Sequence, residues 1–476
     1  MVNDIDLDDV FMYIDRTSSK IGQQYLYYKL RNYKPDKQIR RLKKVFYTNP
    51  NLRQNIQIQF SGLNHRKAFE LEKLFHTDFV KPKFARYYKI LVFITLFILF
   101  FSILNKYFLL LLIPVFLINS VLHYKNKIYT SYFIDGIVQM LKAYKIAKEV
   151  IKQREIANVF DDDTFLKKIE ELKRKSNFIL LGEKLNHPTL IVFWLLFEIV
   201  KIVFNLEGLV FYSLMDHIEY NKLSIESLFV FIGKIDTAIS IIGVERKNQT
   251  CSPDFVNEKR LHFVKMYHPL IENCIKNDLL LTEKSFLLTG SNMSGKTTFI
   301  RAVALNAILG KSLDFCFAEK FEIPDLKKVM TSIRVNDDLL ENKSYYLQEV
   351  LKIKEIIKAS EDKDNYYLFV LDEILKGTNT QERIAAAKAI LSYIDSSHHI
   401  VLVSTHDIEL VNLLKNRYEL YHFNEHIVDN RLYFDYKIKK GAVATGNAIK
   451  ILELYEFPSE IIKDALLVRK NFIEDK

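Results

Sequence analysis

The chain has 476 residues, and its 68 lysines and arginines against 58 aspartates and glutamates give a formal net charge of +10. This length allows about two to four domains. The basic balance suits either a polyanion or an anionic membrane surface as a partner. The three cysteines, Cys251, Cys274 and Cys316, have no CxxC spacing and follow no secretory start, which excludes a disulfide framework and indicates a reduced, cytoplasmic protein body.

Two apolar runs lie close together in the first third of the chain. Residues 90–104 are apolar apart from Thr95 and Ser102, and residues 107–122 are again mostly apolar. A membrane-spanning helix needs about 20 apolar residues, and tyrosines at the flanks of both runs can extend each run into the interface. Because a soluble helix seldom lacks a charged face over such a length, we predict a transmembrane helical hairpin at residues 85–125 rather than a buried hairpin.

The charges around these runs predict their orientation. Only Lys106 lies in the turn, whereas basic residues cluster at both outer ends: Lys81, Lys83, Arg86, Lys89, Lys125 and Lys127. By the positive-inside rule both ends lie in the cytoplasm. We therefore expect a protein of the cell's cytoplasmic membrane that contacts lipid through residues 85–125 and keeps the rest of the chain in the cytoplasm.

The next segment is helical in pattern. Residues 129–175 have long helical periodicity with many lysines, interrupted at Asp161–Asp163, which reads as a helix break with a capping acid. A third apolar stretch, residues 190–204, contains Glu198 and Lys201 at helical spacing. We interpret it as a helix packed in the protein core.

A glycine-rich loop near residue 290 is the most informative motif of the chain. It follows the apolar strand pattern of residues 285–289, precedes the helical pattern of residues 298–309, and has the spacing Gly, four residues, Gly-Lys-Thr. Such loops hold the phosphates of a nucleotide with backbone N–H groups at a helix N-terminus, with a lysine at the β and γ phosphates and a threonine hydroxyl on Mg²⁺. The predicted ATP-binding residues are Gly290, Ser291, Asn292, Met293, Ser294, Gly295, Lys296, Thr297 and Thr298, with Lys296 also assigned a catalytic role.

Two later apolar strands end in polar residues suited to the same chemistry. Residues 366–371 lead into Asp372 and Glu373, and residues 399–405 lead into His406. The carboxyl ends of parallel strands form the ligand edge of an open α/β sheet. Asp372 is therefore predicted to hold Mg²⁺ together with Thr297, Glu373 to activate the attacking water, and His406 to sense the γ-phosphate.

These motifs together resemble the MutS mismatch-repair ATPases, which belong to the wider ABC-type class. The resemblance is carried by ordered blocks over about residues 250 to 470. They are Ser252-Pro253-Asp254-Phe255, His268-Pro269-Leu270, Thr289 to Thr298, Thr331-Ser332-Ile333-Arg334, Asp337-Asp338-Leu339, Ser344 to Glu349, Asp372-Glu373-Ile374, Gly377 to Thr380, and Ser404-Thr405-His406-Asp407.

The resemblance implies a mechanism. Two ATPase domains face each other as a homodimer, and Ser344 of one chain completes the ATP site of the other chain in trans. ATP with Mg²⁺ tightens the dimer, and hydrolysis releases it. The chain departs from the family's pattern at Ser291, which stands in place of a proline, and at Leu375-Lys376, which replaces a glycine-arginine pair. Neither change removes a phosphate or Mg²⁺ ligand.

The sequence therefore predicts an α/β P-loop (ABC-type) ATPase domain preceded by an all-α core and lever region with a transmembrane hairpin. We expect a helical core-domain start at residues 1–80, the hairpin at 85–125, a helical lever and core region at 126–248, and the ATPase domain with C-terminal dimerisation helices at 249–476. The family's mismatch-reading N-terminal domain has no counterpart in this sequence, so we do not expect direct mismatch reading.

Two classes of function fit these features. The first is a membrane-tethered, MutS-like, ATP-dependent DNA-binding protein related to mismatch repair, acting on DNA without mismatch specificity or on branched DNA. The second is a membrane-embedded mechanochemical ATPase that has lost DNA binding and acts on a protein partner that the sequence does not identify. Stimulation of ATP hydrolysis by DNA separates the two classes.

Overall fold

A computed structural model describes residues 4–32, 34–185, 191–291, 293–333, 345–428, 431–442 and 448–474. The chain divides into two compact units. The carboxy-terminal unit contains Met1–Ile14, Lys29–Asp36 and Val244–Lys476, and the helical unit contains Asp15–Tyr28 and Lys37–Gly243. The segments of each unit are therefore not contiguous in sequence, unlike the linear division expected from the sequence.

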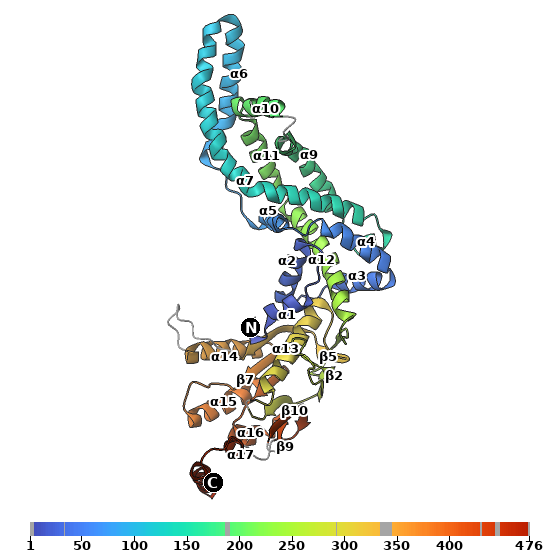
Figure 1. The fold of residues 1–476 in the computed structure, drawn as a ribbon, viewed down its shortest axis with the longest axis vertical. Helices are drawn as coiled ribbons and strands as arrows, with labels where there is room; N and C mark the ends of the chain where they lie inside the picture. Colours follow the sequence, from blue (N-terminus) through green and yellow to red (C-terminus); the bar gives the residue numbers. More distant parts are fainter. Residues whose placement is uncertain are drawn as a thin grey trace. The chain divides into compact units, whose positions relative to one another are not determined.

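The helical unit consists of helices joined by short connections (Figure 1). Its helices are α2 (Lys20–Arg31, whose last turn belongs to the other unit), α3 (Lys37–Thr48), α4 (Pro50–Ser61), η2 (Arg66–Glu72), α5 (Lys73–His76), η3 (Lys83–Tyr87), α6 (Tyr88–Leu104), η4 (Lys106–Leu111), α7 (Leu112–Val150), α8 (Arg154–Ala157), α9 (Thr164–Leu185), α10 (Ile191–Val203), α11 (Leu206–Tyr220) and α12 (Lys222–Glu245).

Helices α6 and α7 run side by side as a hairpin joined through η4 (Figure 1). The second arm does not end near residue 125 but continues as one helix to Val150. The break predicted at Asp161–Asp163 is confirmed, because the Asp162 carboxylate accepts the Thr164 N–H at 2.8 Å where α9 begins.

Among the residues that the structure describes, three helical segments are long and apolar enough to cross a membrane, by length and composition: Lys83–Leu104, Lys106–Val150 and Lys222–Glu245. The third of these, α12, buries 78% of its apolar window inside the protein, whereas the first two bury 17% and 11%. The exposed pair forms the hairpin, and α12 acts as an interior helix.

The carboxy-terminal unit is built on a six-stranded sheet with the order β10-β9-β4-β8-β7-β6. In the described part of this sheet the β9–β10 pair is antiparallel and the other pairs are parallel. The strands are β4 (Ser285–Thr289), β6 (Leu326–Ser332), β7 (Tyr366–Asp372), β8 (Ile400–Ser404), β9 (Tyr418–Val428) and β10 (Arg431–Lys440). Strands β4 and β8 are buried at every position, as expected of central parallel strands covered on both faces.

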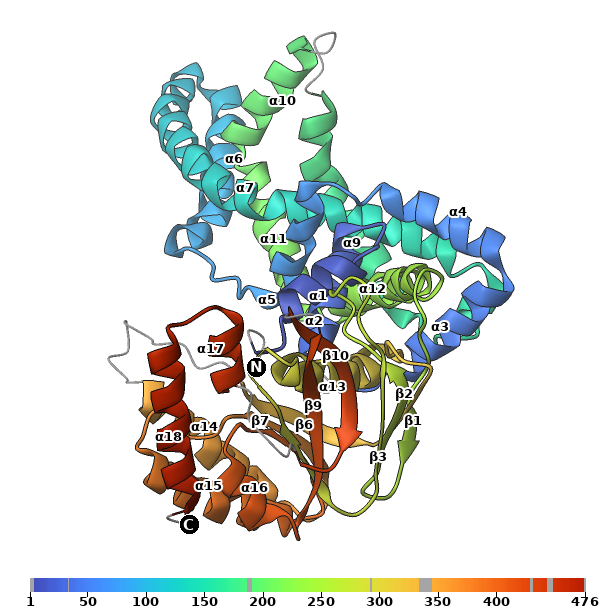
Figure 2. The same ribbon diagram turned by 60° about the horizontal axis from the view of Figure 1, so that its bottom comes forward.

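Helices cover both faces of this sheet (Figure 2). Leu287, Phe369 and Val401 pack with α14, α15 and α16 on one face, whereas Phe286 points to the other face and stacks on Phe299 of α13 with ring centroids 5.8 Å apart. The alternation follows from the two-residue period of a strand. The helices are α13 (Lys296–Leu313), α14 (Tyr345–Ser360), α15 (Thr380–Asp395), α16 (Ile408–Leu414), α17 (Ala448–Leu454) and α18 (Ser459–Glu474).

A smaller sheet with the order β1-β5-β2-β3 completes this unit. Its strands are β1 (Asp254–Val256), β2 (Leu261–Met266), β3 (Asn277–Leu281) and β5 (Lys320–Pro324). The N-terminal helix α1 (Leu7–Ile14) belongs to the same unit, and the preceding Asp6 forms an ion pair with Arg301 of α13 at 3.1 Å.

Candidate nucleotide site

The loop between β4 and α13 has the backbone that its glycines permit. Gly290 has φ +142° and Gly295 has φ +94°, values that side chains of L residues rarely tolerate. A Cβ atom at Gly290 would lie 2.7 Å from the Ser294 hydroxyl, which itself donates to the Ser291 carbonyl at 2.8 Å. Because α13 begins at Lys296, the free N–H groups of its first turn and the positive end of its dipole face the loop.

Lys296 is folded across this loop. Its ammonium donates to the carbonyl oxygens of Gly290 at 2.7 Å and Ser291 at 2.8 Å. Burial lowers the pKa of Lys296, although the carboxylates of Glu373 and Asp372 favour its charged form. The Lys296 ammonium is thus held at the loop and is almost fully shielded from water.

Thr297 and Asp372 bring two oxygen ligands together at the start of α13. The Thr297 hydroxyl donates to Asp372 Oδ2 at 2.7 Å, and the Ser404 hydroxyl donates to Asp372 Oδ1. Hydroxyl and carboxylate oxygens are the ligand types that Mg²⁺ prefers. The donor set therefore fits a Mg²⁺ ion held by Thr297 directly and by Asp372 directly or through water.

Glu373 is anchored at the end of β7 by a lysine and a histidine. Its Oε2 lies 2.9 Å from Lys376 Nζ and its Oε1 lies 3.1 Å from His406 Nδ1. Burial opposes ionisation, but the hydrogen bonds and charges of Lys376 and His406 outweigh it and lower the pKa of Glu373. Glu373 is consequently a carboxylate at neutral pH and can accept a proton or a hydrogen bond from water.

Glu349 is a site residue that sequence reasoning did not single out. It is buried in α14, and its Oε1 accepts the backbone N–H of Leu375 at 2.6 Å. Leu375 has φ +60° and Glu373 has φ +51°, so the turn that carries the carboxylate is strained. The signal in the sequence is weak: Glu349 is an acid at helical spacing from Ile353 and Ile356, which are buried on the same side of α14.

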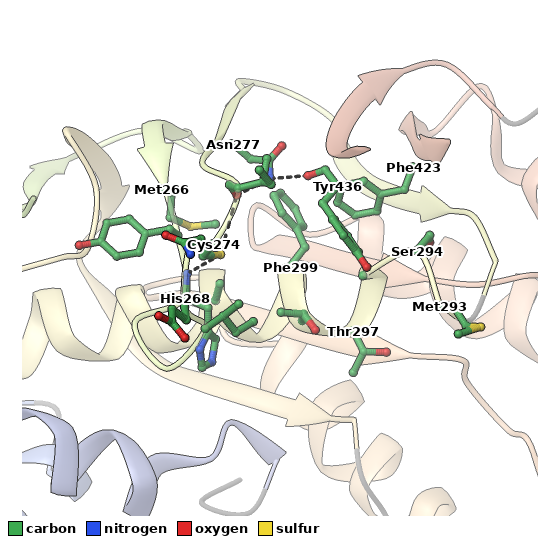
Figure 3. Close-up of a pocket in the computed structure, with 18 residues that line it drawn as sticks. Met266, His268, Cys274, Asn277, Met293, Ser294, Thr297, Phe299, Phe423 and Tyr436 are labelled. Carbon is green, nitrogen blue, oxygen red and sulfur yellow. Dashed lines mark hydrogen bonds between the residues drawn. The ribbon is translucent and has the colours of Figure 1, made fainter. Parts of the chain in front are cut away.

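A cavity of about 460 Å³ adjoins the loop (Figure 3). Its volume lies within the range of about 300–1,000 Å³ that is usual for small-molecule pockets. Phe299, Phe423 and Tyr436 line it beside Ser294 and Thr297 of the loop. The remaining lining residues include Met266, His268, Ile271, Asn277 and Met293.

His268 is a second residue that sequence reasoning did not place in a site, since its block suggested only the entry to the domain. It is buried at this cavity, and burial lowers its pKa. The imidazole is therefore neutral at physiological pH and suits an uncharged ring rather than a phosphate.

The structure thus gathers most of the predicted site residues at the carboxyl edge of β4, β7 and β8. Those brought together are Gly290, Ser291, Met293, Ser294, Gly295, Lys296, Thr297, Thr298, Asp372, Glu373 and His406. His406 reaches Glu373 but is half-exposed, and Arg383 holds the neighbouring Asp407 through two bonds of 2.8 and 3.2 Å. Asn292 and Ser344 lie outside the described residues.

Comparison with known proteins places this geometry in context. The sequence profile of MutS domain V matches residues 286–472. The DNA mismatch repair protein MutS of Oceanobacillus iheyensis is 30% identical over 320 residues, which are 64% of this chain and 34% of that protein. The protein of the same name from Staphylococcus haemolyticus is 29% identical over 361 residues, 73% of this chain and 38% of that protein. The DNA mismatch repair protein MutS of Listeria monocytogenes is 30% identical over 317 residues, which are 64% of this chain and 34% of that protein. The chain thus spans about a third of the length of these relatives.

Proposed function

We propose, from the premise that this chain belongs to the MutS family, that it is a membrane-anchored ATPase that couples ATP hydrolysis to DNA. The observation that carries the ATPase assignment is the juxtaposition of Thr297 with Asp372 and of Glu373 with His406 at one loop. A loop that only bound a phosphate would not need an ionised, anchored carboxylate beside it.

The residues of the loop have distinct tasks in this proposal. Backbone N–H groups around Gly290–Thr297 bind the phosphates, and Lys296 turns from its loop carbonyls to the β and γ phosphates. Thr297 and Asp372 would hold Mg²⁺, which would offset the negative charge of the phosphates. Glu373 orients the attacking water and accepts its proton, and His406 fixes the Glu373 carboxylate from the solvent side.

The adjoining cavity fits the rest of the nucleotide. Its aromatic walls of Phe299, Phe423 and Tyr436 offer flat apolar surfaces to a purine, and the neutral His268 imidazole adds a polar edge. The cavity is also lined by Thr297 and Thr298, so a base bound in it would lie next to the loop that binds the phosphates.

The site is completed by a second copy of the chain. Ser344 of that copy is assigned to the γ-phosphate, as the family resemblance implies, which makes the chain a homodimer when ATP is bound. Exposed apolar residues on α18, such as Leu467, 61% exposed, and Ile461, 48% exposed, leave a carboxy-terminal surface for a partner copy.

The α6–α7 hairpin is assigned to the bilayer. It exposes large apolar side chains over its length: Phe93, Phe100, Ile103, Leu110, Ile113, Leu117 and Val121 are between 56% and 81% exposed. The polar side chains of Thr95 and Asn119, in contrast, are fully buried between the helices. A hairpin that is apolar outside and polar inside suits lipid, where helices satisfy their backbone groups internally. Deletion of residues 85–125 should move the protein from the membrane fraction to the soluble fraction.

The effect of DNA on the rate of ATP hydrolysis tests whether DNA is the molecule on which the ATPase acts. The curated relatives are named as DNA mismatch repair proteins, and the basic net charge favours a polyanion. We expect the detergent-purified protein to hydrolyse ATP faster with duplex or branched DNA, in a salt-dependent manner. The Glu373→Gln variant should lose about 10²–10⁴-fold in rate. ATP turnover that ignores DNA but responds to lipid would favour the alternative, a membrane-embedded mechanochemical ATPase without DNA.

A further inference from the structure

Helix α10 turns its charged side to the protein interior and its apolar side outward. The side chains of Glu198 and Lys201 are 18% and 11% exposed, whereas Leu196, Ile199 and Val200 are 58%, 50% and 43% exposed. A helix on a water-soluble surface has the opposite arrangement. The interpretation of residues 190–204 as a helix packed in the core is therefore wrong for the described part of its apolar face.

A closed cluster of charges fixes this orientation. Lys201 Nζ lies 2.5 Å from Glu198 Oε2 and 3.3 Å from Glu207 Oε2. His123 of α7 lies 3.3 Å from Glu198 and 3.8 Å from Glu207. Three of these groups also have the spacing of metal ligands, but the Lys201 ammonium already contacts both carboxylates and supplies the cation. Rotating α10 would leave the buried charges of Lys201, Glu198 and Glu207 unpaired, which is strongly unfavourable.

The end of α10 is tied to the hairpin. The Val203 carbonyl accepts from Asn119 Nδ2 of α7 at 2.8 Å and from Thr95 Oγ1 of α6 at 3.4 Å. Both of these side chains are fully buried. The contacts place the carboxyl end of α10 directly against the two arms of the hairpin, all within the helical unit.

The next helix strengthens this connection. Gly208 of α11 lies so close to the Tyr88 ring at the start of α6 that a Cβ atom would be 2.8 Å from it. Figure 1 shows α10 lying across the hairpin and packed on α7 and α11. The exposed apolar face of α10 therefore continues the exposed apolar surface of α6 and α7.

We infer that α10 is an interfacial membrane helix, with Leu196, Ile199 and Val200 in contact with lipid acyl chains beside the hairpin. This inference rests on the proposed bilayer location of the hairpin and adds a lipid-contacting element outside it. With 13 residues, α10 is about 20 Å long, too short to cross a hydrocarbon core of about 30 Å. It lies in the boundary between headgroups and acyl chains, where helices with one apolar face bind.

The probe for this inference is a single tryptophan placed on the apolar side of α10. Trp194, the one tryptophan of the sequence, is changed to phenylalanine, and Ile199, whose side chain is 50% exposed, is changed to tryptophan (Trp194→Phe, Ile199→Trp). The full-length protein is reconstituted into vesicles of phosphatidylcholine and phosphatidylglycerol that carry bromine at a shallow or a deep acyl position. We expect bromolipid to quench the fluorescence of the tryptophan introduced at position 199, more strongly from the shallow position, while iodide in the water has little effect.

Flotation of the same vesicles separates this inference from the hairpin proposal. Protein that does not float contradicts the hairpin. Protein that floats but is quenched by iodide and not by bromolipid shows that α10 faces water. Protein that floats and is quenched by neither shows that a second copy or another protein covers α10. Either of the last two results overturns the inference while leaving the hairpin intact.

Polar residues on both sides of the probe test the apolar side of α10 directly. In the same background, changing Leu196→Asn and Val200→Asn should abolish most bromolipid quenching and allow iodide quenching, while flotation persists through the hairpin. Ile58→Asn on α4 is the matched control, because Ile58 is 65% exposed in the same unit and outside this surface. It should leave both quenching patterns unchanged, and circular dichroism should confirm that both variants retain their helix content.

Discussion

The Glu349 carboxylate accepts the backbone N–H of Leu375 at 2.6 Å and thereby ties α14 to the turn that carries Glu373. Burial raises the pKa of Glu349, and the N–H groups of Leu375 and Lys376 partly offset this effect. Leu375 stands where the family's pattern has glycine, and it adopts φ +60°. The hydrogen bond therefore holds a residue in a backbone conformation that costs about 1–2 kcal/mol for a side chain with a Cβ.

Loss of this hydrogen bond should slow hydrolysis without weakening ATP binding. Glu349→Ala frees the turn, and because small displacements of catalytic groups cost up to about 100-fold, kcat should fall by about 10- to 100-fold. Glu349→Gln keeps the Oε1 acceptor and should restore kcat to within a few-fold. The measurement is steady-state ATPase activity beside the affinity for a fluorescent ATP analogue. Equal losses in both variants, or a loss of affinity that matches the loss of rate, would contradict a positioning role.

The positions of the site residues were largely predictable from the sequence, since uninterrupted apolar runs marked the buried parallel strands and the motifs lay at their carboxyl ends. Asp372 and His406 needed no more than that. Glu349 was not predictable in this way, because its partner is a backbone N–H that lies 26 residues later in the chain. His268 was missed because its role depends on which cavity its short loop lines.

The helical unit was harder to predict for a related reason. The spacing of Glu198 and Lys201 predicted a helix with a charged side, which is what α10 has. Periodicity alone does not say which side faces the protein. That depends on His123 and Glu207, which come from two other helices.

The pH dependence of hydrolysis should follow the ion pair between Glu373 and Lys376. Lys376 and His406 lower the pKa of Glu373. In the wild type Glu373 therefore stays ionised at pH values at which an ordinary glutamate is already protonated. Lys376→Met removes the ammonium that most lowers the pKa of Glu373, so this pKa should rise and the acidic limb of the kcat profile should move to higher pH. Profiles from pH 4.5 to 8 would test this, with Lys388→Met on α15 as a control at a distant lysine. An unchanged acidic limb would argue against Glu373 as the base.

The hydroxyl of Thr297 should control the Mg²⁺ requirement. Thr297→Val keeps the shape but removes the hydrogen bond to Asp372 and one oxygen ligand, and we expect at least about tenfold more Mg²⁺ to be needed for half-maximal activity. Thr297→Ser retains the hydroxyl and should stay close to wild type. Mg²⁺ titrations of ATPase activity at saturating ATP measure the difference. Superimposable titrations of the valine and serine variants would exclude Thr297 as a ligand.

Asp236 should control the stability of the helical unit. Its Oδ1 accepts the Ser18 N–H at 2.8 Å, and its Oδ2 accepts the Ser19 N–H at 2.8 Å and the Ser19 hydroxyl at 2.6 Å. An asparagine at this position would turn an N–H₂ group, itself a donor, toward donors that now bind a carboxylate oxygen. Asp236→Asn should therefore lower the free energy of unfolding by about 1–3 kcal/mol. Gly22 also contacts this carboxylate, and Gly22→Ala should be destabilising because a Cβ atom there has no room.

The pH dependence of stability gives Asp236 a sharper test. Burial raises its pKa to about 6, above its ordinary value of 3.8, even though the three hydrogen bonds lower it. The folded protein therefore binds a proton that the unfolded chain releases between these two pH values, and this contribution to stability is present below pH 3.8 and lost as the pH rises through 6. Asp236→Asn cannot take up the proton, so the stability gained by the wild type between pH 7 and pH 5 should shrink in the variant. Thermal unfolding midpoints in detergent at both pH values measure this difference, and an equal shift in the two proteins would show that other groups govern it.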